Sequence, residues 1–214
     1  MKIALIGATG FVGSAVLAEL LRRDHQVTVL ARHPGKLAPA VGLTVVQADA
    51  QNADEVAHAV KGHDAVVSAY NPGWAVPDLH DQFLRGARAI VSGVKAAGVQ
   101  RLLVVGGAGS LFVAPGVQLV DTPEFPAEWK QGALAARQAL TDLQAESSLD
   151  WTFVSPPLIL EPGDRTGHYR LGRDEPLQAA AGGSARISTT DLAVAIVDEL
   201  EKARHVRQRF TVAH

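Results

Sequence analysis

Short apolar runs alternate with segments of helical periodicity along most of this chain, and this alternation limits the folds open to it. The apolar runs are residues 3–6, 26–31, 43–46, 65–69, 102–105 and 151–154. Helical patterns cover residues 11–21, 54–60, 79–97 and 126–146. Continuously apolar strands separated by helices predict a parallel sheet that is covered on both faces. Right-handed crossovers then give a doubly wound α/β sheet, in which ligands bind at the carboxyl ends of the strands.

The pattern changes after residue 155, where prolines and glycines interrupt it. We expect a helix over residues 190–202, with Thr189 or Thr190 as its N-cap. A short strand over residues 168–171 and a closing strand over residues 209–213 are also expected. The chain is therefore predicted to form one domain, residues 1–214, with a core of about residues 1–155. The remainder, 156–214, is expected to build a small lobe on the substrate side.

Three glycines follow the first apolar run, at Gly7, Gly10 and Gly13, and a helical pattern begins among them. Gly7 is expected to allow a sharp exit from the strand, Gly10 a close approach of the backbone to a pyrophosphate, and Gly13 tight packing of the helix. Such a turn brings backbone N–H groups and the positive end of a helix dipole up to a phosphate. A nucleotide cofactor is the first hypothesis. An ordinary strand–helix turn without a ligand is the alternative.

Composition excludes several classes of function. A net charge of −2 gives no bulk affinity for nucleic acid or for an anionic membrane. The chain has no cysteine, which excludes disulfides and thiol catalysis and fits a cytoplasmic protein. Its eight histidines lack the spacing of a metal site. The glycines near the N-terminus also interrupt what would otherwise resemble a secretory signal. We therefore expect no metal, nucleic-acid or membrane partner.

The residues after the second apolar run bear on the identity of the cofactor. NAD-binding sheets usually carry a carboxylate at this point, which holds the ribose 2′-hydroxyl. Here the run ends at Ala31 and is followed by Arg32 and His33. A guanidinium can hold a 2′-phosphate through charge-assisted contacts. The sequence thus favours NADP(H) over NAD(H), with a solvated surface cation as the alternative interpretation of Arg32.

Other cofactor-binding residues are predicted from their places at strand ends. Asp49 and Ala50 follow the third run, and Asp49 either meets the adenine edge or caps the next helix. Ser68, Ala69 and Tyr70 end the fourth run, where small residues leave room for the ribose and nicotinamide. The complete predicted set is Gly7, Thr9, Gly10, Phe11, Val12, Gly13, Arg32, Asp49, Ala50, Ser68, Ala69 and Tyr70.

Longer motifs give the chain a resemblance to the atypical short-chain dehydrogenase/reductase superfamily over nearly its whole length. The motifs are residues 2–13, 102–111, 122–130, 149–157 and 187–193. Within the superfamily the chain is most similar to small proteins called NADH-flavin reductases, near the NmrA-like and biliverdin-reductase-B-like groups. The resemblance implies a Rossmann-like domain, a nicotinamide cofactor and a flavin-type acceptor.

One departure from the superfamily pattern is informative. Catalytic members use a Tyr-x-x-x-Lys helix to protonate a carbonyl, but here Trp129 and Ala133 stand at that spacing. The missing proton donor argues against alcohol, carbonyl and sugar-epimerase chemistry at oxygen. Flavin reduction tolerates the loss, because the protein mainly supplies proximity and orientation. The sequence predicts an NADPH-dependent oxidoreductase that passes hydride to a flavin or similar conjugated acceptor. The alternative is a non-catalytic, NmrA-like regulator that senses NADP(H).

Candidate residues for the acceptor side follow the fourth and fifth runs or lie in the helix after the fifth. Trp74, Phe112, Phe125 and Trp129 either stack on an isoalloxazine or belong to the core. Ser110 is the candidate hydrogen-bond donor to a flavin or carbonyl, or else an ordinary loop serine. The expected partner is a small-molecule acceptor, and the sequence leaves monomer and homodimer open.

Overall fold

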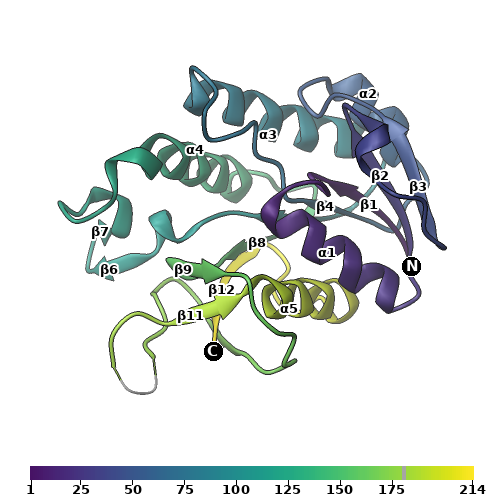
Figure 1. The fold of residues 1–214 in the computed structure, drawn as a ribbon. Coiled ribbons are helices and arrows are strands. Elements are labelled where there is room, and N and C mark those ends of the chain that lie inside the picture. Colours follow the sequence, from purple (N-terminus) through teal and green to yellow (C-terminus); the bar gives the residue numbers. More distant parts are fainter. Residues whose placement is uncertain (180–181) are drawn as a thin grey trace.

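The computed structural model describes residues 1–179 and 182–214, and an eight-stranded sheet runs through its centre (Figure 1). The strand order is β10-β12-β8-β5-β4-β1-β2-β3. All neighbours are parallel except β10, which runs antiparallel to β12. The strands are β1 (Lys2–Ile6), β2 (Gln26–Ala31), β3 (Leu43–Gln47), β4 (Ala65–Ser68), β5 (Arg101–Val105), β8 (Asp150–Ser155), β10 (Arg170–Gly172) and β12 (Gln208–Ala213). The predicted α/β class with a mostly parallel sheet is confirmed.

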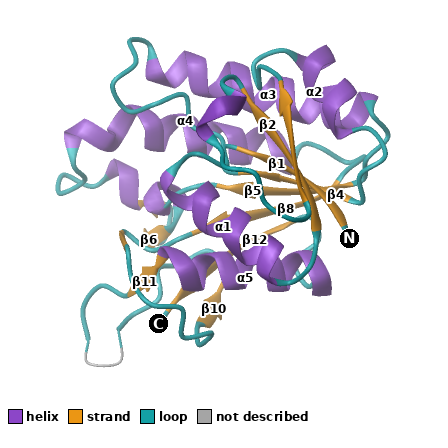
Figure 2. Ribbon diagram, turned by 45° about the vertical axis from the view of Figure 1, so that its right-hand side comes forward, coloured by secondary structure: helices purple, strands orange, loops and turns teal. Residues whose placement is uncertain are grey.

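Helices cover both faces of the sheet, as the apolar runs predict (Figures 1 and 2). Helices α1 (Phe11–Arg22) and α5 (Thr189–Lys202) pack on one face, and α2 (Ala53–Val60), α3 (Leu79–Ala96) and α4 (Ala127–Gln144) on the other. Successive strand residues therefore belong to different hydrophobic cores. Leu5 faces α1 and α5, and Ile6 faces the layer of α2, α3 and α4. Because both are buried, β1 has no polar face.

Side-chain hydrogen bonds cap the N-termini of two helices, α2 and α5. The Asn52 side chain accepts hydrogen bonds from two backbone N–H groups at the start of α2. At α5 the cap is Ser188, whose Oγ accepts from Asp191 N at 3.0 Å, so the prediction of Thr189 or Thr190 is wrong. Ser188 keeps extended backbone angles whereas Thr189 and Thr190 already belong to the helix, and an N-cap requires a residue outside it.

The segment after residue 155 returns to the main sheet. Residues 156–188 contain β9 (Ile159–Glu161) and β11 (Arg186–Ser188), which pair in parallel outside the sheet. Strand β12 then inserts between β8 and β10, and α5 packs against α1. A further hairpin, β6 (Phe112–Ala114) and β7 (Val117–Gln118), follows β5. Only part of the C-terminal third therefore stands outside the α/β layers.

The loop between β9 and β10 is held against α1 and α5. Arg165 Nε lies 2.9 Å from Glu19 Oε2 on α1. The backbone N–H groups of Thr166 and Gly167 donate to Asp191 Oδ1 at 2.9 and 2.7 Å. Asp191 is fully buried, and its carboxylate also accepts hydrogen bonds from the Thr166 hydroxyl and from His214. Burial alone would raise the pKa of Asp191, but these hydrogen bonds outweigh it and lower the pKa, so the carboxylate stays ionised.

A second cluster joins α1 to α5 through the carboxylate of Asp198. It accepts hydrogen bonds from Tyr169 Oη at 2.7 Å, Arg23 Nη1 at 2.8 Å and Lys202 Nζ at 2.9 Å. Burial alone would raise the pKa of Asp198, but these hydrogen bonds outweigh burial and lower the pKa to about 2. The cluster therefore stabilises the folded chain through an ionised carboxylate.

Candidate cofactor and acceptor site

The turn between β1 and α1, residues 7–13, is built on glycine and is called here the glycine turn. Gly7 has φ +87°, and Gly10 N donates to Gly7 O at 3.0 Å. A Cβ at Gly7 would lie 2.3 Å from Ala69 O, and a Cβ at Gly13 would lie 2.0 Å from Gly7 O. A Cβ at Gly10 would meet only Gly7 O, at 3.3 Å. Packing therefore requires glycine at positions 7 and 13, while Gly10 keeps the outer side of the turn open.

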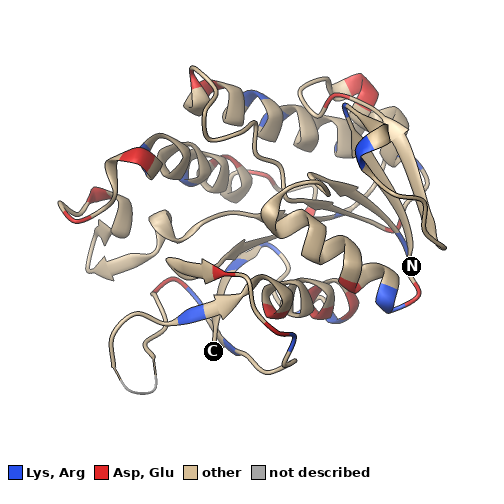
Figure 3. Ribbon diagram, in the orientation of Figure 1, with Lys and Arg blue, Asp and Glu red and all other residues tan. Residues whose placement is uncertain are grey.

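The first turn of α1 presents backbone donors without acceptors. Within residues 1–179 and 182–214, the N–H groups of Phe11, Val12 and Gly13 donate to no protein atom. No acidic residue stands in this turn, and Figure 3 shows no charged segment at this end of α1. Free N–H groups and the helix dipole together favour an anion at this place.

A groove of about 130 Å³, called here the β2–β3 groove, extends from the glycine turn across the ends of β2 and β3. Its lining includes Thr9, Arg32, Lys36 and Asp49. Arg32 and Lys36 are exposed, and neither takes part in an ion pair within the described residues. These cations make the outer end of the groove favourable for an anion.

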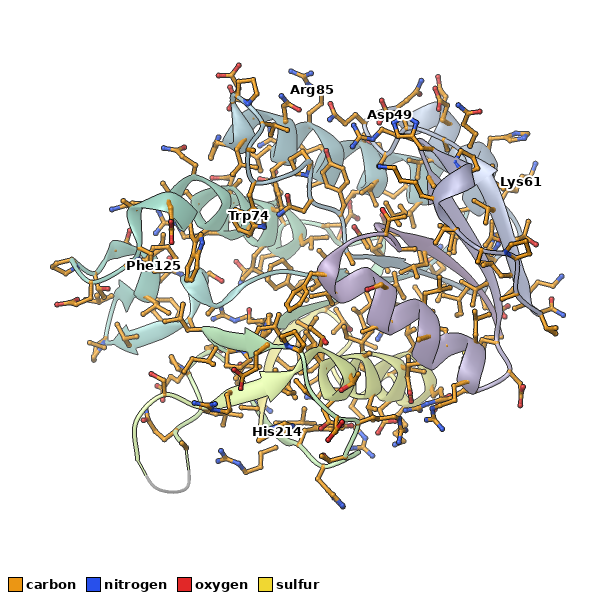
Figure 4. All side chains as sticks on the ribbon, viewed as in Figure 1. Asp49, Lys61, Trp74, Arg85, Phe125 and His214 are labelled. Atoms are coloured by element: carbon orange, nitrogen blue, oxygen red, sulfur yellow. The ribbon has the colours of Figure 1, made fainter. Side chains whose placement is uncertain are left out.

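Asp49 keeps its side chain at the β2–β3 groove, beside α2 in Figure 4. Its Oδ1 accepts a hydrogen bond from Gln51 N at 2.9 Å. Since Asn52 caps α2, the alternative role of Asp49 as the helix cap does not apply.

Tyr70 separates the β2–β3 groove from a larger cavity. Its hydroxyl accepts from Gln51 Nε2 at 3.1 Å and donates to Gln82 O at 3.2 Å. Its ring packs so tightly on α3 that a Cβ at Gly86 would lie 2.3 Å from Cε1. Burial raises the pKa of Tyr70, so the phenol stays protonated at neutral pH.

The larger cavity, called here the central cavity, has a volume of about 430 Å³ and begins at the first turn of α1. Trp74, Phe83, Phe125 and Trp129 supply aromatic walls, and the small residues at 106–109 line another side. Figure 4 shows Trp74 beside α4 and Phe125 near its start. Trp74 is 61% exposed and Trp129 42%, so the mouth of the cavity is bordered by indole rings that are open to solvent.

Most of the predicted site residues come together around these two spaces. Gly7, Thr9, Arg32, Asp49 and Ala50 line the β2–β3 groove, Gly10, Phe11, Val12 and Ala69 line the central cavity, and Tyr70 lines both. Gly13 lines neither space. Its lack of a side chain lets the first turn of α1 pack against the backbone of Gly7.

Ser68, Ser110 and Phe112 lie elsewhere, which corrects their predicted roles. Ser68 is on the α3–α4 side of β4 and lines neither space, because neighbouring strand residues point to opposite faces. Ser110 is 3% exposed, and its Oγ accepts a hydrogen bond from Arg209 Nη1 at 3.0 Å. Phe112 packs under the same guanidinium, 5.9 Å from its ring centre. Ser110 and Phe112 thus anchor the β6–β7 hairpin.

One wall of the central cavity was not predicted from the sequence. It is formed by Pro156, Pro157, Leu158 and Leu160. These residues follow β8 directly. The rule that ligands bind at the carboxyl ends of parallel strands was the signal that could have found them.

The described part of the chain contains neither a cluster of metal ligands nor a helix able to span a membrane. Within residues 1–179 and 182–214, no three His, Cys, Asp or Glu side chains gather closely enough to hold a metal ion. None of the helices described has both the length and the apolar character needed to cross a bilayer.

Comparison with known proteins identifies the family. A family model described as NAD(P)H-binding matches residues 7–203, which include the glycine turn and six of the eight strands of the main sheet. The chain belongs to this NAD(P)H-binding family. With the motifs described above, this makes it an atypical short-chain dehydrogenase/reductase.

Relatives of the chain carry different names. It is 41% identical to the uncharacterized protein YwnB of Bacillus subtilis, over 99% of this chain and 98% of that protein. A structure from Bacteroides thetaiotaomicron, provisionally named an epimerase, matches with 45% identity and a TM-score of 0.92, covering 100% of this chain and 96% of that one. Another from Streptococcus pneumoniae, provisionally named an NADH-flavin reductase, matches with 33% identity and a TM-score of 0.85, covering 100% and 99%. The family therefore establishes NAD(P)H binding and leaves the reaction to be inferred from the site.

In this atypical short-chain dehydrogenase/reductase, Trp129 and Ala133 stand where catalytic members carry the proton-donating tyrosine and its lysine. Neither residue can donate a proton to a substrate. Trp129 and Ala133 both line the cavity. Among the described residues that line it, Tyr70 is the only one with an ionisable side chain, and its hydroxyl is already engaged by Gln51 and Gln82. The cavity thus offers aromatic and aliphatic surface but no free acid or base.

Proposed function

We propose that this protein is an NADPH-dependent reductase that passes hydride to a flavin or a similar conjugated acceptor. The central cavity supports this proposal: it adjoins the glycine turn, has aromatic walls and contains no free proton donor among its described lining residues. A conjugated acceptor spreads the charge it gains and can take its proton from water. Proximity and orientation are then the protein's main contribution.

The glycine turn and the β2–β3 groove are suited to the parts of NADPH that carry charge. We assign the diphosphate to the free N–H groups of Phe11, Val12 and Gly13, where the helix dipole adds to the attraction. Arg32 and Lys36 are assigned to the 2′-phosphate, because a guanidinium forms charge-assisted bonds with phosphate oxygens. Asp49 is assigned to the adenine edge.

The central cavity is suited to the nicotinamide and to the ring of the acceptor. When bound, the cofactor supplies hydride, and Val12 and Ala69 line the route from the glycine turn into the cavity. Trp74 and Trp129 provide exposed indole faces on which a planar ring can stack. The small residues 106–109, which also line the cavity, leave room for the two rings to approach each other.

The decisive experiment follows oxidation of NADPH with FMN, FAD and a quinone, with wild-type protein and Gly107→Leu. Gly107 lines the central cavity, has extended backbone angles, and a Cβ there would meet nothing within 4 Å. Leucine therefore reduces the room for the acceptor without disturbing the packing. We expect turnover with wild type, and a raised KM for the acceptor in the variant with unchanged affinity for NADPH.

Tight NADPH binding without oxidation by any acceptor would overturn the reductase proposal. That result would support the second candidate, a non-catalytic regulator that senses NADP(H). The same lack of a free acid or base in the central cavity favours this candidate, because a sensor needs no proton transfer.

A further inference from the structure

A second cavity lies between α3, α4 and the sheet, and no part of the proposed reaction uses it. It has a volume of about 210 Å³ and is called here the α3–α4 cavity. Its interior is apolar, with Ile90 from α3, Leu143 from α4, and Val104 and Phe153 from the sheet. Engineered apolar cavities of about 150 Å³ bind benzene. The space is therefore large enough for one small ring and a substituent.

The floor of this cavity carries one polar group that lacks a partner. Ser68, at the end of β4, is 4% exposed and lines the α3–α4 cavity. Its hydroxyl makes no hydrogen bond to any residue that the structure describes. Two other hydroxyls line the cavity: that of Tyr70 is already bonded to Gln51 and Gln82, and Ser92 is exposed. Because Ser68 lines the cavity and its hydroxyl is not engaged by the protein, a bound molecule can exchange a hydrogen bond with it.

Charges surround the mouth of the cavity, but they neutralise one another across the two helices. Arg88 Nε lies 2.8 Å from Asp142 Oδ2, and Lys95 Nζ lies 2.7 Å from Glu146 Oε2. No cation or anion of the lining is left to bind an ionised ligand. The interior would also impose a desolvation cost on a charged molecule.

We propose that the α3–α4 cavity is a binding site for a small uncharged molecule with a hydrocarbon ring and one hydrogen-bonding group, which bonds to Ser68. A phenol has this chemistry. The site is separate from that of the acceptor, because Tyr70, Phe83 and Val105 form the wall that the α3–α4 cavity shares with the central cavity.

Methyl NMR during titration of the full chain with phenol, and in parallel with toluene, tests the proposal. Ile90 and Leu143 line only the α3–α4 cavity, whereas Val12 and Leu158 line only the central cavity. We expect saturable shifts at Ile90 and Leu143, unchanged when NADPH and FMN are present at saturation. Phenol should bind about three- to tenfold more tightly than toluene, which is the usual worth of one hydrogen bond.

Ser68→Ala is the matched variant, since it removes the hydroxyl and leaves the apolar lining intact. The preference for phenol over toluene should disappear in this variant, with toluene binding unchanged. The proposal is overturned if neither probe shifts Ile90 and Leu143, if only Val12 and Leu158 respond, or if Ser68→Ala keeps the preference. Because none of these measurements needs turnover, failure of the reductase assay would leave the result unaffected.

Discussion

Replacing Gly10 by alanine separates the role of the glycine turn in binding from its role in folding. Gly10 is the N-cap of α1 with φ −85° and ψ 173°, angles that any residue adopts. The new methyl group would meet only Gly7 O, at 3.3 Å. It would stand on the open side of the turn, where we assign the cofactor diphosphate.

The two expected effects differ greatly in size. Alanine is a poorer N-cap than glycine by roughly 0.5–1 kcal/mol, and its smaller freedom in the unfolded chain offsets most of this. The folded state should therefore change by less than about 1 kcal/mol. If the methyl group displaces the diphosphate from two N–H groups, each worth about 1.5–3 kcal/mol to a charged acceptor, binding loses about 3–6 kcal/mol. That corresponds to a loss of about 100-fold or more in affinity.

Calorimetric titration with NADPH and thermal unfolding of the same samples test this expectation. Gly35→Ala is the control for the substitution itself, because a Cβ there would meet nothing within 4 Å and Gly35 does not line the β2–β3 groove. Gly13→Ala is the opposite control: a Cβ 2.0 Å from Gly7 O should destabilise the fold itself. A folded Gly10→Ala protein that binds NADPH as tightly as wild type would refute the assignment of the diphosphate to this turn.

The remaining predictions concern Arg32 in the β2–β3 groove, the hydroxyl of Tyr70 and the stability of the fold in acid. Arg32→Ala should weaken NADPH binding by about 10- to 150-fold in calorimetry, from the loss of a charge-assisted contact of about 1.5–3 kcal/mol, while NADH binding stays close to wild type; equal losses would contradict the role of Arg32. Tyr70→Phe should lower the free energy of unfolding by about 1 kcal/mol in urea titrations but leave kcat for a flavin unchanged, whereas a kcat about 100-fold lower would show that Tyr70 supplies a proton. The pKa of Asp198 is about 2 in the folded protein and about 3.9 in an unfolded chain, so its stabilisation is present above about pH 4 and is lost as the pH falls toward 2. Unfolding measured across that range should show a shallower pH dependence in Asp198→Asn than in wild type, and identical slopes would exclude this contribution.

Features of the fold that depend on nearby residues could be predicted from the sequence. The run at residues 3–6, the glycines after it and the helix that follows are decided within a few turns of chain, and the structure has β1, the glycine turn and α1 in these places. Strands β9 and β11 could not be found in this way. Each has three residues, and they pair only because the chain brings segments about twenty-five positions apart into register.

The same distinction holds for the site. Arg32 and Asp49 could be placed because the carboxyl ends of neighbouring parallel strands meet at one edge of the sheet. Ser68 could not, since strand periodicity says that it faces away from Val67 but not which face adjoins the cofactor. Ser110 was misjudged because its partner, Arg209, lies almost a hundred residues away on β12.

The packing of α5 against α1 has a consequence for the order of events during protein synthesis. Helix α1 emerges from the ribosome early, yet residues 189–202, which pack beside it on the same face of the sheet, are made near the end of the described chain. At about 5–20 residues per second, the nascent chain spends many seconds with this apolar surface uncovered. Nascent chains that stop before residue 189 should therefore bind ribosome-associated chaperones. Protease resistance should appear only in chains long enough to include α5.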